Sequence, residues 1–115
     1  MSHKLTSNQS VVYNAEFQSS GVLEITPEQI VYQNDGSTFH NVMLVFPIKV
    51  SGTNNYVGGL NYNLTEGDWN TFFASLTLTS TNEFDKQEEA ALKYALSQIE
   101  GNWGLAASDW TYSVS

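Results

Sequence analysis

The sequence predicts an α+β domain, in which an antiparallel β-meander of about five strands is followed by two helices packed on one sheet face. Two observations carry this prediction. Apolar and polar residues alternate with a period of two through the first half of the chain, and from residue 66 onward apolar residues recur with helical spacing. With 115 residues, the chain is long enough for one hydrophobic core. We therefore expect a single globular domain over residues 11–115, preceded by a polar, flexible N-terminal tail over residues 1–10.

Turn residues divide the first half of the chain into segments. Pro27 ends one alternating run because proline cannot donate to a strand ladder. The Asp35-Gly36 pair is a strong hairpin signal. Pro47 indicates a bulge or a sheet edge, and Gly58-Gly59 marks a bend or a close backbone approach. The expected strands cover residues 11–17, 21–26, 29–33, 40–50 and 55–63.

Two helices are expected after the strands. The first covers residues 66–76, because Trp69, Phe72, Phe73 and Leu76 share one helical face. The second covers residues 85–100, where Asp85 and Glu88 have the spacing of a capping box and Gly101 supplies a stop. The stripe that this helix buries is expected to comprise Leu92, Ala95, Leu96 and Ile99.

The periodicity is less decisive in two places, the connection after the first helix and the end of the chain. Residues 76–80 alternate like a strand but follow a helical pattern, so both states stay open there. Trp110, Tyr112 and Val114 alternate in the same way, which predicts a short C-terminal strand over residues 109–114.

Composition excludes several classes of function. The absence of cysteine excludes disulfide scaffolds, thiolate-bound zinc, iron–sulfur clusters and a thiol nucleophile. Twelve acidic residues against four lysines, with no arginine, give a net charge of −8, which argues against direct binding of nucleic acid or of an anionic membrane. The sequence contains neither a membrane-spanning apolar stretch nor the apolar core of a signal peptide, so we expect a protein of a bacterial host cytoplasm.

Candidate catalytic groups are few. His40 lies beside a turn with no nucleophile motif near it. Glu66 and Asp68 could form a glycosidase pair beside Trp69, but a helix start already explains two carboxylates there. Asn34, Asp35 and Ser37 could offer oxygen ligands to calcium, although they lack the spacing of a calcium loop. We therefore expect a protein that is not an enzyme, with no catalytic residue, no metal and no cofactor.

A binding surface is the better prediction, and acidity is its main feature. Glu16 and Glu24 are expected on the outer face of the first hairpin. Glu83, Asp85, Glu88 and Glu89 crowd the start of the second helix. These six acids are the predicted contacts to a basic partner, because an unbalanced negative field steers association with positive surfaces. Trp103 and Trp110 are weaker aromatic candidates for the same role.

Three functions are compatible with these features. The first is an acidic interaction protein that docks on a basic protein, with charge mimicry inhibiting a nucleic-acid-processing enzyme. The second is an assembly subunit, such as a virion component, that self-associates through sheet edges or the uncovered sheet face. The third is a small carbohydrate-binding module that uses the tryptophans. The lack of cysteine and arginine and the wealth of Asn, Ser and Thr are reminiscent of accessory proteins of phages and mobile elements, a likeness of composition that no motif carries.

Overall fold

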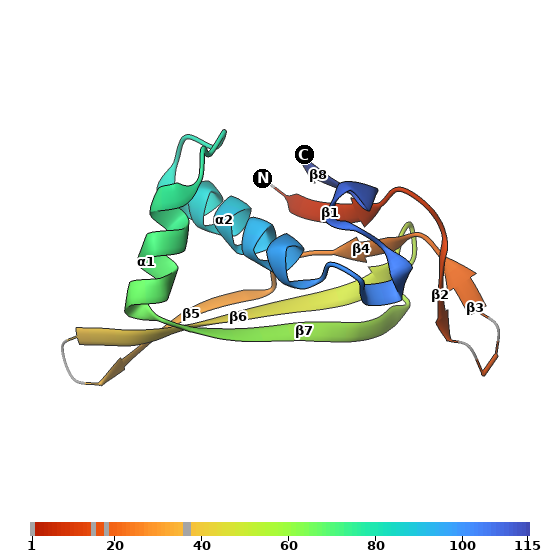
Figure 1. Ribbon diagram of the computed structural model, residues 1–115, viewed down its shortest axis with the longest axis horizontal. Coiled ribbons are helices and arrows are strands. Elements are labelled where there is room, and N and C mark those ends of the chain that lie inside the picture. Colours follow the sequence, from red (N-terminus) through yellow and green to blue (C-terminus); the bar gives the residue numbers. More distant parts are fainter. Residues whose placement is uncertain (1, 15, 18, 36–37) are drawn as a thin grey trace.

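The computed structural model confirms the α+β class: two helices lie over one face of an antiparallel sheet (Figure 1). The structure describes residues 2–14, 16–17, 19–35 and 38–115, so part of the predicted turn at 34–37 lies outside the described residues. The strands of this part of the chain are β1 (His3–Ser7), β2 (Val11–Asn14), β3 (Ser19–Gly21), β4 (Leu23–Ile25), β5 (Gln29–Asp35), β6 (Thr38–Val50), β7 (Tyr56–Thr65) and β8 (Trp110–Val114). The α-helices are α1 (Glu66–Ser75) and α2 (Glu83–Gln98), and two short 3₁₀ turns cover Asn102–Gly104 and Ala107–Asp109.

The longest strand, β6, is the centre of the main sheet. One of its edges pairs with β5 and β4, which lie end to end, and its other edge pairs with β7. The sheet continues from β4 to β1 and from β1 to β8, so six strands of the described residues belong to it. Strands β5, β6 and β7 form the predicted meander over 29–33, 40–50 and 55–63 with slightly longer limits.

The first predicted hairpin is built differently from the expectation. The expected strand 21–26 is divided, because β3 pairs only with β2 in a separate two-stranded sheet, whereas β4 enters the main sheet (Figure 1). Ser51 N donates to the carbonyl oxygen of Val22 (2.7 Å), which directs the chain into the main sheet at that residue. The chain also passes closely there, since a Cβ on Gly21 would lie 3.0 Å from Val50 Cγ1. The β2–β3 hairpin consequently projects from the domain.

Residues 3–7, assigned to a tail by the sequence analysis, form a strand between β4 and β8. His3, Leu5 and Ser7 alternate into the interior and are all buried. Two of these three residues are polar, so hydropathy gives no sign of the strand. Their polar atoms have partners: Ser7 Oγ, for example, accepts a hydrogen bond from Leu23 N (2.9 Å) and donates one to the carbonyl oxygen of Gln9 (2.9 Å).

Both α-helices begin at side-chain caps. Thr65 Oγ1 accepts from Asp68 N (3.1 Å) at the start of α1, and Asn82 Oδ1 accepts from Asp85 N (2.9 Å) at the start of α2. The second helix therefore begins two residues before the predicted Asp85, because Asn82 serves as the cap. Gly101 follows α2 in the left-handed conformation (φ 91°), in keeping with the predicted stop. Residues 76–80 between the helices form neither helix nor strand.

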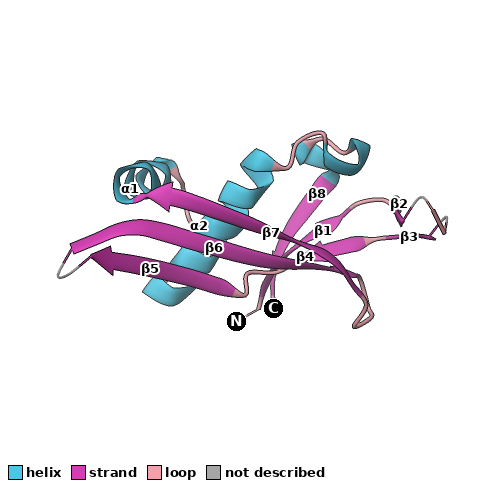
Figure 2. Cartoon of the chain, turned by 90° about the horizontal axis from the view of Figure 1, so that it is seen from below, coloured by secondary structure: helices cyan, strands magenta, loops and turns pink. Residues whose placement is uncertain are grey.

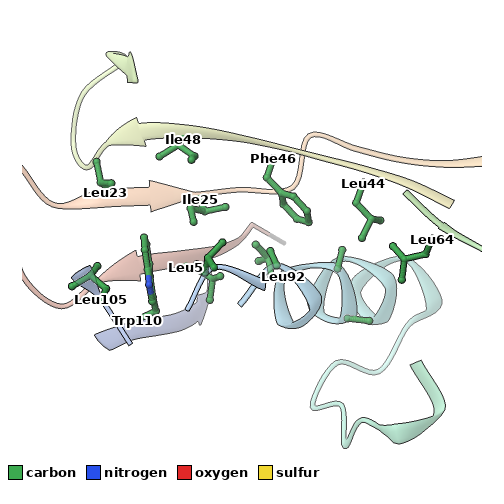
Figure 3. Close-up of a cluster of buried hydrophobic side chains, with 14 of the residues drawn as sticks. Leu5, Leu23, Ile25, Leu44, Phe46, Ile48, Leu64, Leu92, Leu105 and Trp110 are labelled. Carbon is green, nitrogen blue, oxygen red and sulfur yellow. The ribbon is translucent and has the colours of Figure 1, made fainter. Parts of the chain in front are cut away.

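The core lies between the helices and the sheet (Figure 3). Alternate side chains of β6 enter this core: Leu44 and Phe46 point toward α2, where Leu92 lies, and Ile48 lies further along near Ile25. Leu5 and Trp110 extend the same core under β1 and β8. None of the helices formed by the described residues is long and apolar enough to cross a membrane.

Candidate interaction surface

The six acids predicted to contact a partner do not form one surface. Glu24, Asp85 and Glu89 are buried. Glu16 is exposed between β2 and β3, at the far end of the molecule from the start of α2 (Figure 1). Only Glu83 and Glu88 remain accessible near one another.

Glu24 is satisfied inside the protein. Lys4 Nζ lies 3.0 Å from its Oε1, Lys49 Nζ lies 3.7 Å from its Oε2, and Ser51 Oγ donates to Oε1 at 3.0 Å. Burial acts to raise the pKa of Glu24, but the hydrogen bonds from Lys4 and Ser51 and the charges of both lysines bring it below its ordinary value. This carboxylate ties β4 to β1 and β6 and has no free face for a partner.

Glu89 has a similar role beneath the connection between the helices. Its side chain is fully buried and accepts hydrogen bonds from the backbone N–H groups of Thr79 (3.1 Å) and Ser80 (2.9 Å) and from Ser80 Oγ (2.7 Å). Lys93 Nζ lies 2.8 Å from its Oε2. Burial opposes ionisation, yet the bonds from Lys93, Ser80 and Thr79 together lower the pKa of Glu89 to about 2. The carboxylate therefore fixes residues 79–80, which have no helix or strand of their own, onto α2.

Asp85 ends a buried line of polar side chains that joins three elements. Its Oδ1 lies 2.9 Å from His3 Nε2, and His3 Nδ1 lies 2.7 Å from the hydroxyl of Tyr112. Hydrogen bonds from His3 and Asn82 lower the pKa of Asp85, whereas burial and the charge of Glu89 raise the pKa of Tyr112 to about 12. A tyrosine, histidine and aspartate in line could relay a proton, but the His3 side chain is 0% exposed. A substrate therefore has no access to the imidazole. The role of these three side chains is structural, since they link β1, β8 and α2.

Glu88, one of the two accessible acids, lines a groove between β5 and the first turns of α2. The groove holds about 370 Å³ and is lined by residues 27–31 together with Phe84, Gln87 and Glu88. Phe84 is 69% exposed although it is a large apolar side chain. Glu88 is half-buried there, and no hydrogen bond or ion pair connects it to another described residue. Burial raises the pKa of Glu88, and the neighbouring Asp85 carboxylate adds to this while His3 opposes it.

The charge around this groove is predominantly negative. Glu28 contributes a second exposed carboxylate at its wall. Glu83, whose side chain is 81% exposed, lies next to Phe84 in the chain, and its nearest cation is Lys86 at 3.7 Å. That pair is largely solvated, so it neutralises little of the local field.

The tryptophans predicted as weaker contacts occupy different environments. Trp110 is buried and belongs to the core, so it offers no surface to a partner. Trp103 is half-buried, with its ring edge-on to Trp110 at a centroid distance of 5.9 Å. Trp103 also adopts a left-handed backbone conformation (φ 55°), which is uncommon for any residue except glycine.

The remaining candidates of the sequence analysis do not converge on a site. His40 is exposed at β6. Glu66 and Asp68 occupy the first turn of α1, as the capping interpretation predicts, and Trp69 between α1 and the sheet is buried. Trp69 therefore offers no stacking platform beside this carboxylate pair. Within the described residues, no three histidine or carboxylate side chains are grouped so that they could hold a metal ion.

Sequence reasoning missed His3 and the groove. The alternation of His3 with Leu5 was a signal for the first, since it places the imidazole on the same face as an apolar residue. The groove depends on how α2 crosses β5, which no local pattern specifies. No family model, no curated protein and no solved structure matches the chain.

Proposed function

We propose that this protein is a non-enzymatic interaction protein that docks a basic partner protein on the groove between β5 and the start of α2. One observation carries the proposal: the half-buried carboxylate of Glu88, which no hydrogen bond or ion pair joins to another described residue, lines the same groove as the exposed ring of Phe84. A few residues, often aromatic anchors that become buried against the partner, supply most of the binding free energy of an interface.

The charge of the chain supports a positively charged partner. The groove is lined by Glu28 and Glu88, Glu83 precedes its Phe84 in the chain, and the whole chain carries a net charge of −8. A basic group seated against Glu88 would relieve the cost of its half-buried charge, and the surrounding field would increase the association rate. We propose nucleic-acid-processing enzymes as the partner class, because their basic surfaces bind phosphates. Occupation of such a surface by these carboxylates would inhibit the enzyme by charge mimicry.

The test is capture of proteins from nuclease-treated bacterial lysate by the immobilised protein at about 50 mM and about 500 mM salt. We expect a basic protein that is retained at low salt, released at high salt and displaced by added DNA. Retention should fail in a triple variant carrying Glu83→Gln, Phe84→Ala and Glu88→Gln. Glu16→Gln is the matched control, because it removes one exposed carboxylate at the opposite end of the molecule. Equal retention by the wild type and the triple variant, or retention that salt leaves unchanged, would contradict the proposal.

A second candidate is an assembly subunit, and the projecting β2–β3 hairpin favours it. Val12 is 59% exposed and Phe17 is 73% exposed on this hairpin, which stands away from the main sheet. Apolar side chains on a projection can insert into a neighbouring subunit. Light scattering of the concentrated protein distinguishes the two functions. A defined oligomer that Phe17→Ser dissolves would favour assembly, and a monomer at every concentration would exclude it.

A further inference from the structure

The edge strand β5 has one backbone side that no strand covers. It pairs with β6 from Gln29 to Asp35, and no other strand of the described residues pairs with it. The N–H and C=O groups on the outer side of an edge strand are a template on which another extended chain can add.

Residues 29–33 of this edge also lack the sequence features that often prevent such addition. Edge strands are normally protected by charged side chains, proline or a bulge. The five residues Gln29–Gln33 are all uncharged and contain no proline. The register shift in this ladder comes only after them, between Gln33 and Asn34.

The start of α2 extends over this edge. In Figure 2, which views the molecule from below, α2 crosses β5 and its first turns emerge beyond the strand. Phe84 and Glu88 on the helix and Ile30 and Val31 on the strand line the groove between these turns and β5. An added strand would therefore lie beside β5 with α2 as a wall along one face.

The wall offers an apolar and an anionic contact within about one helical turn. Phe84 and Glu88 are four residues apart on α2, which corresponds to about 6 Å along the helix axis. Because α2 crosses β5 in Figure 2, an added strand would pass across this turn, with every second side chain on the face toward the helix. An apolar and a basic side chain on that face would suit the ring of Phe84 and the carboxylate of Glu88.

We infer that β5 takes up an extended, basic segment of the partner as an additional strand, with an apolar residue against Phe84 and a lysine or arginine, two residues away, against Glu88. This inference rests on the proposed function and specifies how the partner binds. A second copy of this chain is a poor occupant, because it would bring further net negative charge to Glu28, Glu83 and Glu88. An edge on the other flank of the sheet offers a contrast: the groove beside β7 is lined by Asn63, Leu64 and residues of α1 and α2, with Asp68 as its one acid.

The test uses synthetic peptides of about eight residues, with threonine on one strand face and leucine and arginine two residues apart on the other. A second version carries N-methyl groups on alternate backbone nitrogens, made in both registers. It keeps every side chain and charge, and in one of the two registers the methylated nitrogens are those that would donate to β5, so that the strand ladder cannot form. We expect the plain peptide to bind, to slow amide exchange in residues 29–33 and to leave exchange in β7 unchanged. At least one N-methylated register should bind about tenfold more weakly, since several backbone hydrogen bonds are lost.

Each outcome has a defined meaning. Equal binding of the plain and both N-methylated peptides would overturn strand addition, while the proposed docking of a basic partner would stand. Protection of β7 in place of β5 would also overturn it. If no peptide of this design binds, or if Glu88→Gln and Phe84→Ala bind as the wild type does, the inference fails. Loss of partner capture by the triple variant would then still support the proposed function by itself.

Discussion

Two groups of carboxylates in this protein differ in what surrounds them, although both lie partly on α2. Glu24, Asp85 and Glu89 are buried, and each has partners inside the protein. Glu28 and Glu88 line the groove, Glu83 is exposed next to its Phe84 in the chain, and Glu88 has no hydrogen bond or ion pair to another described residue. The difference arises from position on the helix. Asp85, Glu89 and Leu92 lie along one buried stripe of α2, whereas Phe84 and Glu88 lie along the neighbouring stripe and are not buried. The buried carboxylates are therefore expected to stabilise the fold, and the carboxylates of the groove are expected to bind the basic partner.

The largest effect should come from removing Glu89. In Glu89→Ala, the N–H groups of Thr79 and Ser80 lose their acceptor and Lys93 loses its counter-ion. We expect the free energy of unfolding to fall by roughly 3 kcal/mol or more, measured by urea denaturation. Glu88→Ala is the control on the same helix and should change stability by less than about 1 kcal/mol. Similar losses in both variants would remove the distinction between the two groups.

Acid should weaken the protein through the same carboxylate. The pKa of Glu89 is lowered from 4.5 to about 2, so its contribution is fully present above pH 4.5 and is lost as the pH falls toward about 2. The expected loss across this interval is about 3 kcal/mol from Glu89. Glu24 and Asp85 act in the same direction, since their pKa values are also lowered. Urea denaturation at several pH values tests this, and a free energy of unfolding that stays constant from neutral pH to pH 2 would disprove it.

His3→Ala should have the next largest effect. The substitution removes the partner of Asp85 and of the Tyr112 hydroxyl within a buried line. We expect a loss of roughly 2 kcal/mol in the free energy of unfolding. His40→Ala, at an exposed position of β6, is the matched control and should be close to neutral. A near-neutral His3→Ala would indicate that β1 contributes little to the fold.

The smallest effect should have the opposite sign. Because burial raises the pKa of Glu88, its charge is disfavoured in the folded protein, and the neutral Glu88→Gln should be slightly more stable near neutral pH. The gain should amount to a few tenths of a kcal/mol in thermal or urea unfolding, since the side chain is only half-buried. A clear loss of stability would show that Glu88 has an internal partner and belongs with the buried group.

The sequence was sufficient for the fold class because the periodicities of β5, β6, β7 and both helices follow burial closely. It failed for β1, where His3 and Ser7 are buried polar residues whose partners come from distant parts of the chain. The division of the acids could have been foreseen in part, since extending the stripe of Leu92 backward passes through Glu89 and Asp85. The groove could not have been predicted from the sequence, because it depends on the angle at which α2 crosses the sheet edge.

The central claim is that Glu88, and not the adjacent Glu89, receives the basic group of the partner. The most direct measurement is the Kd of the leucine–arginine peptide at low salt for Glu88→Gln and Glu89→Gln, expressed per folded molecule. We expect Glu88→Gln to bind about tenfold more weakly than the wild type or worse, because a charge-assisted contact is lost, and Glu89→Gln to bind as the wild type does. Unchanged binding by Glu88→Gln, or an equal loss in both variants, would contradict the account.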